Sequence, residues 1–448
     1  MNIHLVSLGC ARNLVDSEGM LGQIKNAGWQ ITDQPEDAHI IIVNTCSFIE
    51  SAAEESIDTI LEMAQLKESG KCRSLIVAGC LPERYGKDIS SELEEVDLFL
   101  GTGAFDQIVD AVKGTLKDSK CILPDPDSII IPGPDSPREL SLPYMAYLKI
   151  AEGCSRHCTY CIIPRLRGKQ KSRQPEHILA EAEKLINAGT KELVLIAQDT
   201  TGYGRDLGKD ANLADLLKDI SGLSDSIRAD NQAIDDIWIR FLYGHPESID
   251  ENIIKIINER PNLCSYFDLP VQHASNSILK KMGRNTRDDL HRLFEKIRTT
   301  DPEAVLRTTA IVGFPGETDK DFQSLLDFIE DIRFDNLGVF TYSDSDDLPS
   351  HNLPDHVPEE IAQERHDIIM EQQIEISSKI NEKYLDKTIK VLVEESPEPN
   401  IFTGRTAFQA PEVDGSVYIN SSRRLKPGNF TNVFITDTLE YDLVGETK

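Results

Sequence analysis

The chain has 448 residues, 40% of them hydrophobic and 27% charged, and its net charge at pH 7 is −29. This size fits a globular protein of two to four domains. The electrostatic field of a negatively charged protein repels bare nucleic acid and attracts basic partners. There is no run of 18 or more apolar residues, so we expect no membrane span. The opening MNIHLVSLGC lacks the basic stretch followed by a long apolar stretch that is typical of a secretory signal, and this favours a cytoplasmic protein.

Residues 1–117 alternate apolar runs with helix-like segments. Strand-like runs cover residues 3–8, 39–46 and 74–80, and a segment with helical periodicity follows each of them. This order predicts an α/β domain with a doubly wound parallel sheet, covered by helices on both faces. The proline-rich residues 118–143 carry weak helix and strand signals, and we expect them to form a linker.

Residues 144–375 repeat a strand–helix order. Six strand-like runs occur, YMAYLKIAEG, ELVLIAQDT, DIWIRFLYG, YFDLPVQ, AVLRTTAIVGFPG and NLGVFTYSD. They predict a partial (β/α) barrel of parallel strands, in which the chemistry lies at the C-terminal strand ends.

Residues 384–448 contain short strand-like runs separated by Gly, Asn and Pro turns. They predict a small antiparallel β-barrel. This segment holds ten acidic and seven basic residues, a local net charge of −3. A small barrel that binds the RNA backbone is expected to be basic instead.

Three cysteines follow the first strand of the predicted barrel in C-x3-C-x2-C spacing: Cys154, Cys158 and Cys161. Thiolates suit zinc or iron–sulfur clusters, and four cysteines usually hold a [4Fe–4S] cluster, so three would leave one iron open. The alternatives are a zinc site and a redox dithiol. Zinc would need His157, which directly precedes Cys158 and is too close for easy tetrahedral geometry. The spacing therefore favours a cluster with one open iron.

Cys10, Cys46 and Cys80 each end one of the three N-terminal strand-like runs. Because parallel strands end at a common sheet edge, the three thiols are expected to converge there. The alternative is three buried cysteines that pack as small hydrophobic residues. We interpret them as ligands of a second [4Fe–4S] cluster, again with an open iron. The cysteines without partners at a useful spacing are expected in the core or on the surface: Cys72, Cys121 and Cys264.

The barrel triad, with Tyr160 directly before its third cysteine, resembles the signature of the radical S-adenosylmethionine (SAM) enzymes. In that family SAM chelates the open iron, and its reductive cleavage gives a 5′-deoxyadenosyl radical. The resemblance implies that Tyr160 also contacts the cofactor. It implies further contacts with SAM, from Gln198 and Asp199 to its amino or ribose groups, from Arg240 to its carboxylate, and from Gly313 and Gly316 to its adenine.

The stretches SLGCARNLVDSE and VNTCSFIESAAEESI, with the three-part layout, resemble the methylthiotransferases over essentially the whole chain. These radical enzymes insert a methylthio group into an unactivated C–H bond. The resemblance implies a methylthiotransferase N-terminal domain, a radical SAM barrel and a TRAM-type C-terminal domain. It also implies two [4Fe–4S] clusters, SAM as cosubstrate and an electron donor of the flavodoxin or ferredoxin type. Nothing in the sequence demands more than a monomer.

Two branches of that family compete. One modifies an adenosine beside the anticodon of tRNA, and the other modifies the β-carbon of an aspartate in the twelfth protein of the small ribosomal subunit. The stretch CSFIESAAEESI lacks the Val–Arg–Glu run typical of the tRNA branch and is similar to the ribosomal-protein branch. The acidic last domain also suits a basic ribosomal protein. A TRAM-type domain by itself favours RNA, so a tRNA methylthiotransferase is the alternative. A non-catalytic RNA-binding scaffold with structural metal sites is a third hypothesis.

Overall fold

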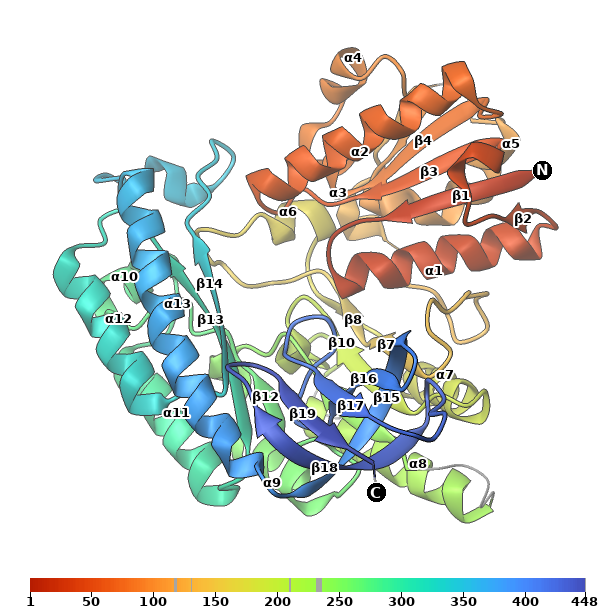
Figure 1. The fold of residues 1–448 in the computed structure, drawn as a ribbon. Helices are drawn as coiled ribbons and strands as arrows, with labels where there is room; N and C mark the ends of the chain where they lie inside the picture. Colours follow the sequence, from red (N-terminus) through yellow and green to blue (C-terminus); the bar gives the residue numbers. More distant parts are fainter. Residues whose placement is uncertain (117–118, 130, 209–210, 231–235, 448) are drawn as a thin grey trace.

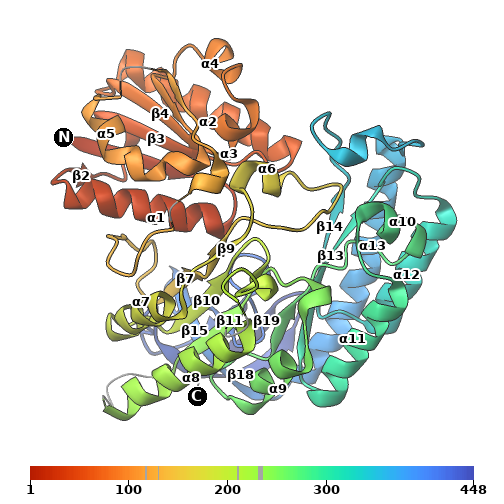
Figure 2. The same cartoon turned by 180° about the vertical axis from the view of Figure 1, so that it is seen from behind.

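The computed structural model describes residues 1–447 apart from residues 117–118, 130, 209–210 and 231–235. Three sheet-containing units follow one another along the chain. Figure 1 shows the N-terminal unit in red and orange above the central unit, with the C-terminal unit in blue beside the central strands. Figure 2 shows the same arrangement from behind.

The N-terminal unit contains a parallel sheet. In the described residues its strands run in the order β2-β1-β3-β4-β5-β6, with the bounds β1 (Asn2–Ser7), β2 (Gln30–Ile31), β3 (Ile40–Thr45), β4 (Ser74–Gly79), β5 (Leu98–Leu100) and β6 (Cys121–Ile122). One face packs on α1 (Ala11–Asn26) and α5 (Ile108–Lys113), and the other on α2 (Glu50–Ser69), α3 (Cys80–Tyr85) and α4 (Ile89–Glu92). Every residue of β3 is buried because helices cover both faces. The predicted doubly wound sheet is confirmed.

The segment expected to be a linker contributes a strand to this sheet. β6 pairs in parallel with β5, so the sheet extends past residue 117, and the expected boundary at residues 117–118 lies outside the described residues. The dense prolines begin only at Pro124, after β6, so the composition of the whole segment concealed the two strand residues.

The central unit contains the six expected strands. They are β7 (Met145–Lys149), β10 (Glu192–Ile196), β11 (Trp238–Phe241), β12 (Tyr266–Asp268), β13 (Val305–Val312) and β14 (Asn336–Thr341). They form two parallel sheets, β7-β10-β11 and β12-β13-β14, and a parallel bridge between Ile239 and Leu263 joins the two. The partial barrel is therefore confirmed.

Helices connect these strands. They are α7 (Pro175–Asn187), α8 (Leu213–Asp230), α9 (Glu251–Glu259), α10 (Asn276–Met282), α11 (Arg287–Thr300) and α12 (Asp319–Ile332), and α13 (Glu359–Asn381) follows β14 and runs beyond residue 375. Between β7 and β10 the chain also forms the short pair β8 (Ala151–Glu152) and β9 (Lys171–Ser172), with α6 (Ile163–Arg167) between them. The barrel cysteines lie in the loop between β8 and α6.

The C-terminal unit is a closed barrel. Its order is β15-β16-β17-β19-β18, with the bounds β15 (Thr388–Glu398), β16 (Ile401–Thr406), β17 (Val417–Asn420), β18 (Phe430–Thr438) and β19 (Leu443–Glu446). Four of the neighbouring pairs are antiparallel, but β17 and β19 are parallel. The prediction of an antiparallel barrel is therefore wrong for one pair of neighbours, since the barrel closes with β17 and β19 running in parallel.

The C-terminal barrel packs against the strands of the central unit. Tyr147, Val194 and Tyr266 share one buried cluster with Leu392 of β15. Trp238 of β11 meets Phe430 edge to face, with ring centroids 4.7 Å apart. No helix of the described residues is long and apolar enough to cross a membrane.

Candidate active site

The three N-terminal cysteines come together at one edge of the sheet. Cys10, Cys46 and Cys80 follow β1, β3 and β4, which are neighbours in the sheet. The backbone at Gly9, next to Cys10, lies so close to Cys46 that a Cβ atom on Gly9 would be 2.6 Å from the Cβ of Cys46. The Cys46 thiol interacts electrostatically with both other thiols. The structure therefore forms one triad from residues far apart in the sequence.

Buried side-chain amides hold this edge in place. Asn13 Nδ2 donates to the carbonyls of Leu8 (2.6 Å) and Thr45 (3.2 Å), which lie at the ends of neighbouring strands. Asn44 Nδ2 in turn donates to the Asn13 carbonyl at 3.0 Å. Sequence reasoning did not single out Asn13. Its polar side chain, three residues after Cys10 and facing the sheet, is the signal that could have found it.

Gly9→Ala is expected to prevent assembly of the N-terminal cluster. Gly9 has a φ of +84° and its Cβ position overlaps Cys46, so the alanine would both strain the turn and push the cysteine away. Iron content after reconstitution should fall from about eight to about four atoms per chain. Gly19→Ala in α1, with nothing within 4 Å, is the matched control and should keep the full iron content. Full iron in Gly9→Ala would contradict the geometry.

The second triad lines a cavity at the C-terminal ends of the barrel strands. Cys154, Cys158 and Cys161 border a cavity of about 310 Å³, to which Gln272 and Ile311 also contribute. Burial, with smaller contributions from the neighbouring thiols, raises the pKa of Cys161 to about 12. Metal binding must therefore drive the loss of this proton.

The two triads lie at the same domain interface. Arg12 and Arg84, from helices of the N-terminal unit, line the cavity of the barrel triad. Ile162, next to Cys161, packs against Cys80. Burial alone raises the pKa of Cys10, but Arg12, with smaller contributions from a backbone hydrogen bond and Arg167, holds it below its ordinary value. Because Arg12 also follows Cys10 by only two residues, its side chain lies between the two triads.

Three of the residues expected to contact SAM line this cavity: Tyr160, Gln198 and Asp199. Gln198 Nε2 donates to Glu152, while its Oε1 is buried without a partner. The carboxylate of Asp199 is already engaged, by Arg156 Nε at 2.8 Å and by the Gly202 N–H at 2.9 Å. The free acceptor of Gln198 is available to a ligand, whereas Asp199 holds the cavity wall.

The prediction for Arg240 is corrected. Its side chain is fully buried, its Nε lies 2.6 Å from Glu192, and Arg405 of the C-terminal barrel binds the same carboxylate at 2.7 Å. Arg240 is not among the residues that line the cavity. Its side chain points from β11 toward the C-terminal barrel, and sequence alone does not show which face of the strand that barrel covers.

The predictions for Gly313 and Gly316 are corrected as well. Neither glycine is among the cavity-lining residues, although Ile311 of the same segment is. A Cβ on Gly313 would lie 2.5 Å from the Cβ of Ala362 in α13, and one on Gly316 would meet the Lys281 ammonium. The glycines do permit close approach, but toward protein neighbours.

Both triads fit iron–sulfur clusters by the chemistry of their donors. Each offers three thiols, the soft ligands that such clusters take, and leaves one position for another ligand. His157, the fourth ligand a zinc site would need, has an exposed side chain and does not line the cavity. Among the described residues, no group of three His, Cys, Asp or Glu is spaced for a single metal ion. The unpartnered Oε1 of Gln198 fits a polar cosubstrate beside the barrel triad.

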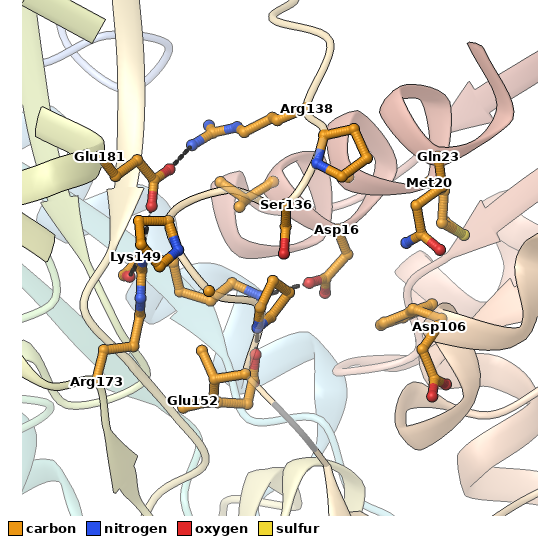
Figure 3. Close-up of a pocket in the computed structure, with 18 of the residues that line it drawn as sticks. Asp16, Met20, Gln23, Asp106, Ser136, Arg138, Lys149, Glu152, Arg173 and Glu181 are labelled. Carbon is orange, nitrogen blue, oxygen red and sulfur yellow. Dashed lines mark hydrogen bonds and ion pairs between the residues drawn. The ribbon is translucent and has the colours of Figure 1, made fainter. Parts of the chain in front are cut away.

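A chain of buried ion pairs lies behind the N-terminal triad. Arg167 Nη2 lies 3.7 Å from Cys80 Sγ, and its Nη1 binds Asp16 at 2.6 Å. Lys149 binds both Asp16 and Glu152. Lys149, Asp16 and Glu152 line a second cavity, of about 360 Å³, between α1, α7 and residues 131–140 (Figure 3). The ion pairs fix α1, and with it Cys10, relative to the barrel.

Several cavity residues were not singled out from the sequence. Tyr243 and Gln272 have φ angles of +62° and +69°, in the left-handed region that non-glycine residues avoid. Arg284 Nη1 lies 3.9 Å from Cys158 Sγ. Burial lowers the pKa of His245 to about 2, helped by nearby arginines, so its ring is neutral. The fold of the barrel brings these residues together from distant parts of the sequence, and no local sequence pattern indicates them.

Comparison with known families agrees with the three units. Residues 2–101 match a family described as uncharacterized protein family UPF0004, residues 148–329 match the radical SAM superfamily, and residues 387–447 match the TRAM domain. Among solved structures, the radical SAM methyltransferase TsrM of Kitasatospora setae, with cobalamin and a [4Fe–4S] cluster bound, superposes with a TM-score of 0.54 at 14% identity. The match covers 76% of this chain and 74% of TsrM and shows a shared fold.

Full-length relatives identify the family. A ribosomal protein uS12 methylthiotransferase RimO from Desulfosudis oleivorans is 50% identical, with all of both chains covered. The protein of the same name from Clostridioides difficile is 48% identical over all of this chain and 98% of its own. With two cysteine triads at one domain interface, a radical SAM barrel and a TRAM domain, the chain belongs to the RimO family of methylthiotransferases.

Proposed function

We propose that this protein inserts a methylthio group at the β-carbon of an aspartate in ribosomal protein uS12, using two [4Fe–4S] clusters and SAM. The observation that carries the proposal is the placement of the six cysteines. Cys10, Cys46 and Cys80 form one triad and the barrel cysteines another, and Arg12, two residues after Cys10, lines the cavity that the barrel cysteines border. A substrate atom held near Arg12 is thus within reach of both sites.

When bound, the clusters and SAM supply hydrogen-atom abstraction and the methylthio group. The thiolates of the chain hold the two clusters, and Gln198, oriented by Glu152, presents its free Oε1 to a donor group of SAM. Apolar side chains such as Ile163, Ile311 and Leu348 line the cavity and exclude water, which protects a reactive species from side reactions.

A protein substrate fits the mouth of the cavity. Phe48 of the N-terminal unit and Phe340 of β14 both line it, yet their side chains are 42% and 51% exposed. Large apolar groups at a cavity rim are typical of surfaces that a partner covers. The net charge of −29 also favours approach of a strongly basic ribosomal protein.

The expected partners and setting belong to the same proposal. An electron donor of the flavodoxin or ferredoxin type would reduce the barrel cluster, and the enzyme would act as a monomer in the cytoplasm. A reducing compartment suits nine cysteines that are all free, as they are here. We propose the domain division 1–117, 118–143, 144–375 and 384–448, in which the second segment is a linker apart from β6, which belongs to the sheet of the first domain.

Mass spectrometry of uS12 and of tRNA, from cells with and without this gene, tests the proposal. We expect uS12 to lack one methylthio group in the cells without the gene, and the tRNA to be unchanged. Restoring the gene with Cys158→Ala should leave uS12 unmodified. Loss of the methylthio group from tRNA instead would make the chain a tRNA enzyme, and no change in either would refute the proposal.

A further inference from the structure

Arg12 of the N-terminal unit reaches into the barrel. It is the second residue of α1, and its Nη1 donates to the carbonyl of Ala197, at the end of β10, at 3.1 Å. Its guanidinium lies over the ring of Tyr243, with Cζ 4.2 Å from the ring centroid. The side chain thus spans the domain interface and forms part of the cavity wall.

The charge of Arg12 is not neutralised by a carboxylate. Two other arginines of the cavity wall form ion pairs, Arg84 with Asp347 at 2.9 Å and Arg156 with Asp199 at 2.8 Å. In the described part of the chain, Arg12 has no such partner within 4.0 Å, the limit for an ion pair. A guanidinium has five N–H donors in a planar fork that matches a carboxylate, so a bidentate acceptor can still bind.

Arg284 is a second cavity arginine for which the described residues show no ion pair, but it lies elsewhere. Its Nη1 is near Cys158 Sγ, and Arg284 also donates to the Pro270 carbonyl. Arg284 is therefore on the side of the barrel triad. Arg12 follows Cys10 by two residues and lines the cavity that the barrel cysteines border, so it lies where a substrate must be to meet both triads.

The backbone under Arg12 is held in a strained conformation. Tyr243 has a φ of +62°, its N–H donates to Asp268 Oδ2 at 2.8 Å, and its carbonyl accepts from the Thr200 N–H at 3.1 Å. Strained non-glycine residues of this kind persist where the surrounding structure fixes them, often at ligand sites. Here the effect is to hold the phenol ring beneath the guanidinium.

We propose that Arg12, held over the Tyr243 ring, binds the side-chain carboxylate of the target aspartate and makes the enzyme select aspartate over asparagine. This inference rests on the proposed function. The carboxylate carbon of aspartate is bonded to the β-carbon. Binding of the carboxylate by Arg12 therefore places the reacting C–H bond beside the guanidinium, between the triads. Arg12 then determines specificity by binding the substrate, whereas the cysteines hold the clusters.

The test measures binding to the reconstituted holoenzyme. Labelled uS12 and its variant with asparagine at the target position are titrated by fluorescence anisotropy. The original enzyme should prefer aspartate by about tenfold to a hundredfold, the range for a hydrogen-bonded charge. Arg12→Gln should lose that preference and bind both proteins alike, and Arg12→Lys should keep part of it because it keeps the charge but loses the planar fork. Arg292→Gln, on the exposed face of α11, is the control and should keep the full preference.

Two further readouts keep the result interpretable. Iron content and substrate-free cleavage of SAM are measured on each variant, so that binding is compared only between proteins that carry both clusters. If Arg12→Gln loses iron because it adjoins Cys10, Tyr243→Leu replaces it, and the aspartate preference should again fall. An unchanged preference, or an equal loss of affinity for both proteins with iron intact, would overturn the role of Arg12. Failure of the original enzyme to methylthiolate uS12 would overturn the proposed function instead.

Discussion

Cys158→Ala is expected to reduce cleavage of SAM to 5′-deoxyadenosine below detection while about four irons per chain remain. Cys158, Cys154 and Cys161 are the thiols of one triad, and losing one leaves too few ligands to hold a cluster with a defined open site. The other triad lies on a different sheet and should load normally. The measurement is chromatography of the nucleoside product after anaerobic reduction, with iron determined on the same sample.

The control for this variant is Cys72→Ala. Cys72 is also buried, but it belongs to the hydrophobic cluster on one face of the N-terminal sheet, away from the cavity. Its removal should cost some stability and leave both iron content and SAM cleavage intact. Substantial cleavage by Cys158→Ala would show that the barrel triad is not the reductive site.

Glu192→Gln is expected to destabilise the docking of the C-terminal barrel by about 3–5 kcal/mol. Glu192 is fully buried and neutralises Arg240 at 2.6 Å and Arg405 at 2.7 Å. Glutamine would fill the same space but leave the buried Arg240 guanidinium without a carboxylate and Arg405 with Glu394 alone, at 2.8 Å. Breaking a buried ion pair in this way costs far more than losing a surface pair.

Tryptophan fluorescence can follow this change locally. Trp238 contacts Phe430 across the same interface, and replacing Trp29, the other tryptophan, by Phe makes Trp238 the sole reporter. The urea midpoint of its signal should fall in Glu192→Gln. It should stay unchanged in Glu395→Gln, a control on an exposed residue of β15. Equal midpoints for the two variants would contradict a structural role for the cluster.

The same cluster predicts a pH dependence. Burial by itself raises the pKa of Glu192, but Arg240 and Arg405 hold it below its ordinary value. A carboxyl whose pKa is depressed in the folded state stabilises it above the unfolded pKa of about 4.3, and this stability is lost as the pH falls. The difference between the original protein and Glu192→Gln should therefore shrink below about pH 4.

The six cysteines could be found from the sequence because their signals are local. C-x3-C-x2-C is a short spacing, and Cys10, Cys46 and Cys80 each directly end an apolar run whose parallel pairing follows from the strand–helix order. The doubly wound sheet and the partial barrel follow from the same order.

What the sequence could not show depends on how the units dock. Arg240 lies in a strand, and only the docked C-terminal barrel turns it into part of a buried cluster with Arg405. Arg12 reaches Tyr243 across the interface of two units, and no spacing in the chain encodes that contact. The parallel pair β17–β19 likewise results from closure of a barrel rather than from a hairpin turn.

The iron and acid-labile sulfide content of three variants tests the central claim most directly. One variant replaces Cys10, Cys46 and Cys80 by alanine, another replaces the barrel triad, and the third replaces both. After anaerobic reconstitution we expect about eight irons in the original chain, about four in each single-triad variant and almost none in the third. About four irons in the original chain, unchanged when the N-terminal triad is removed, would contradict the account.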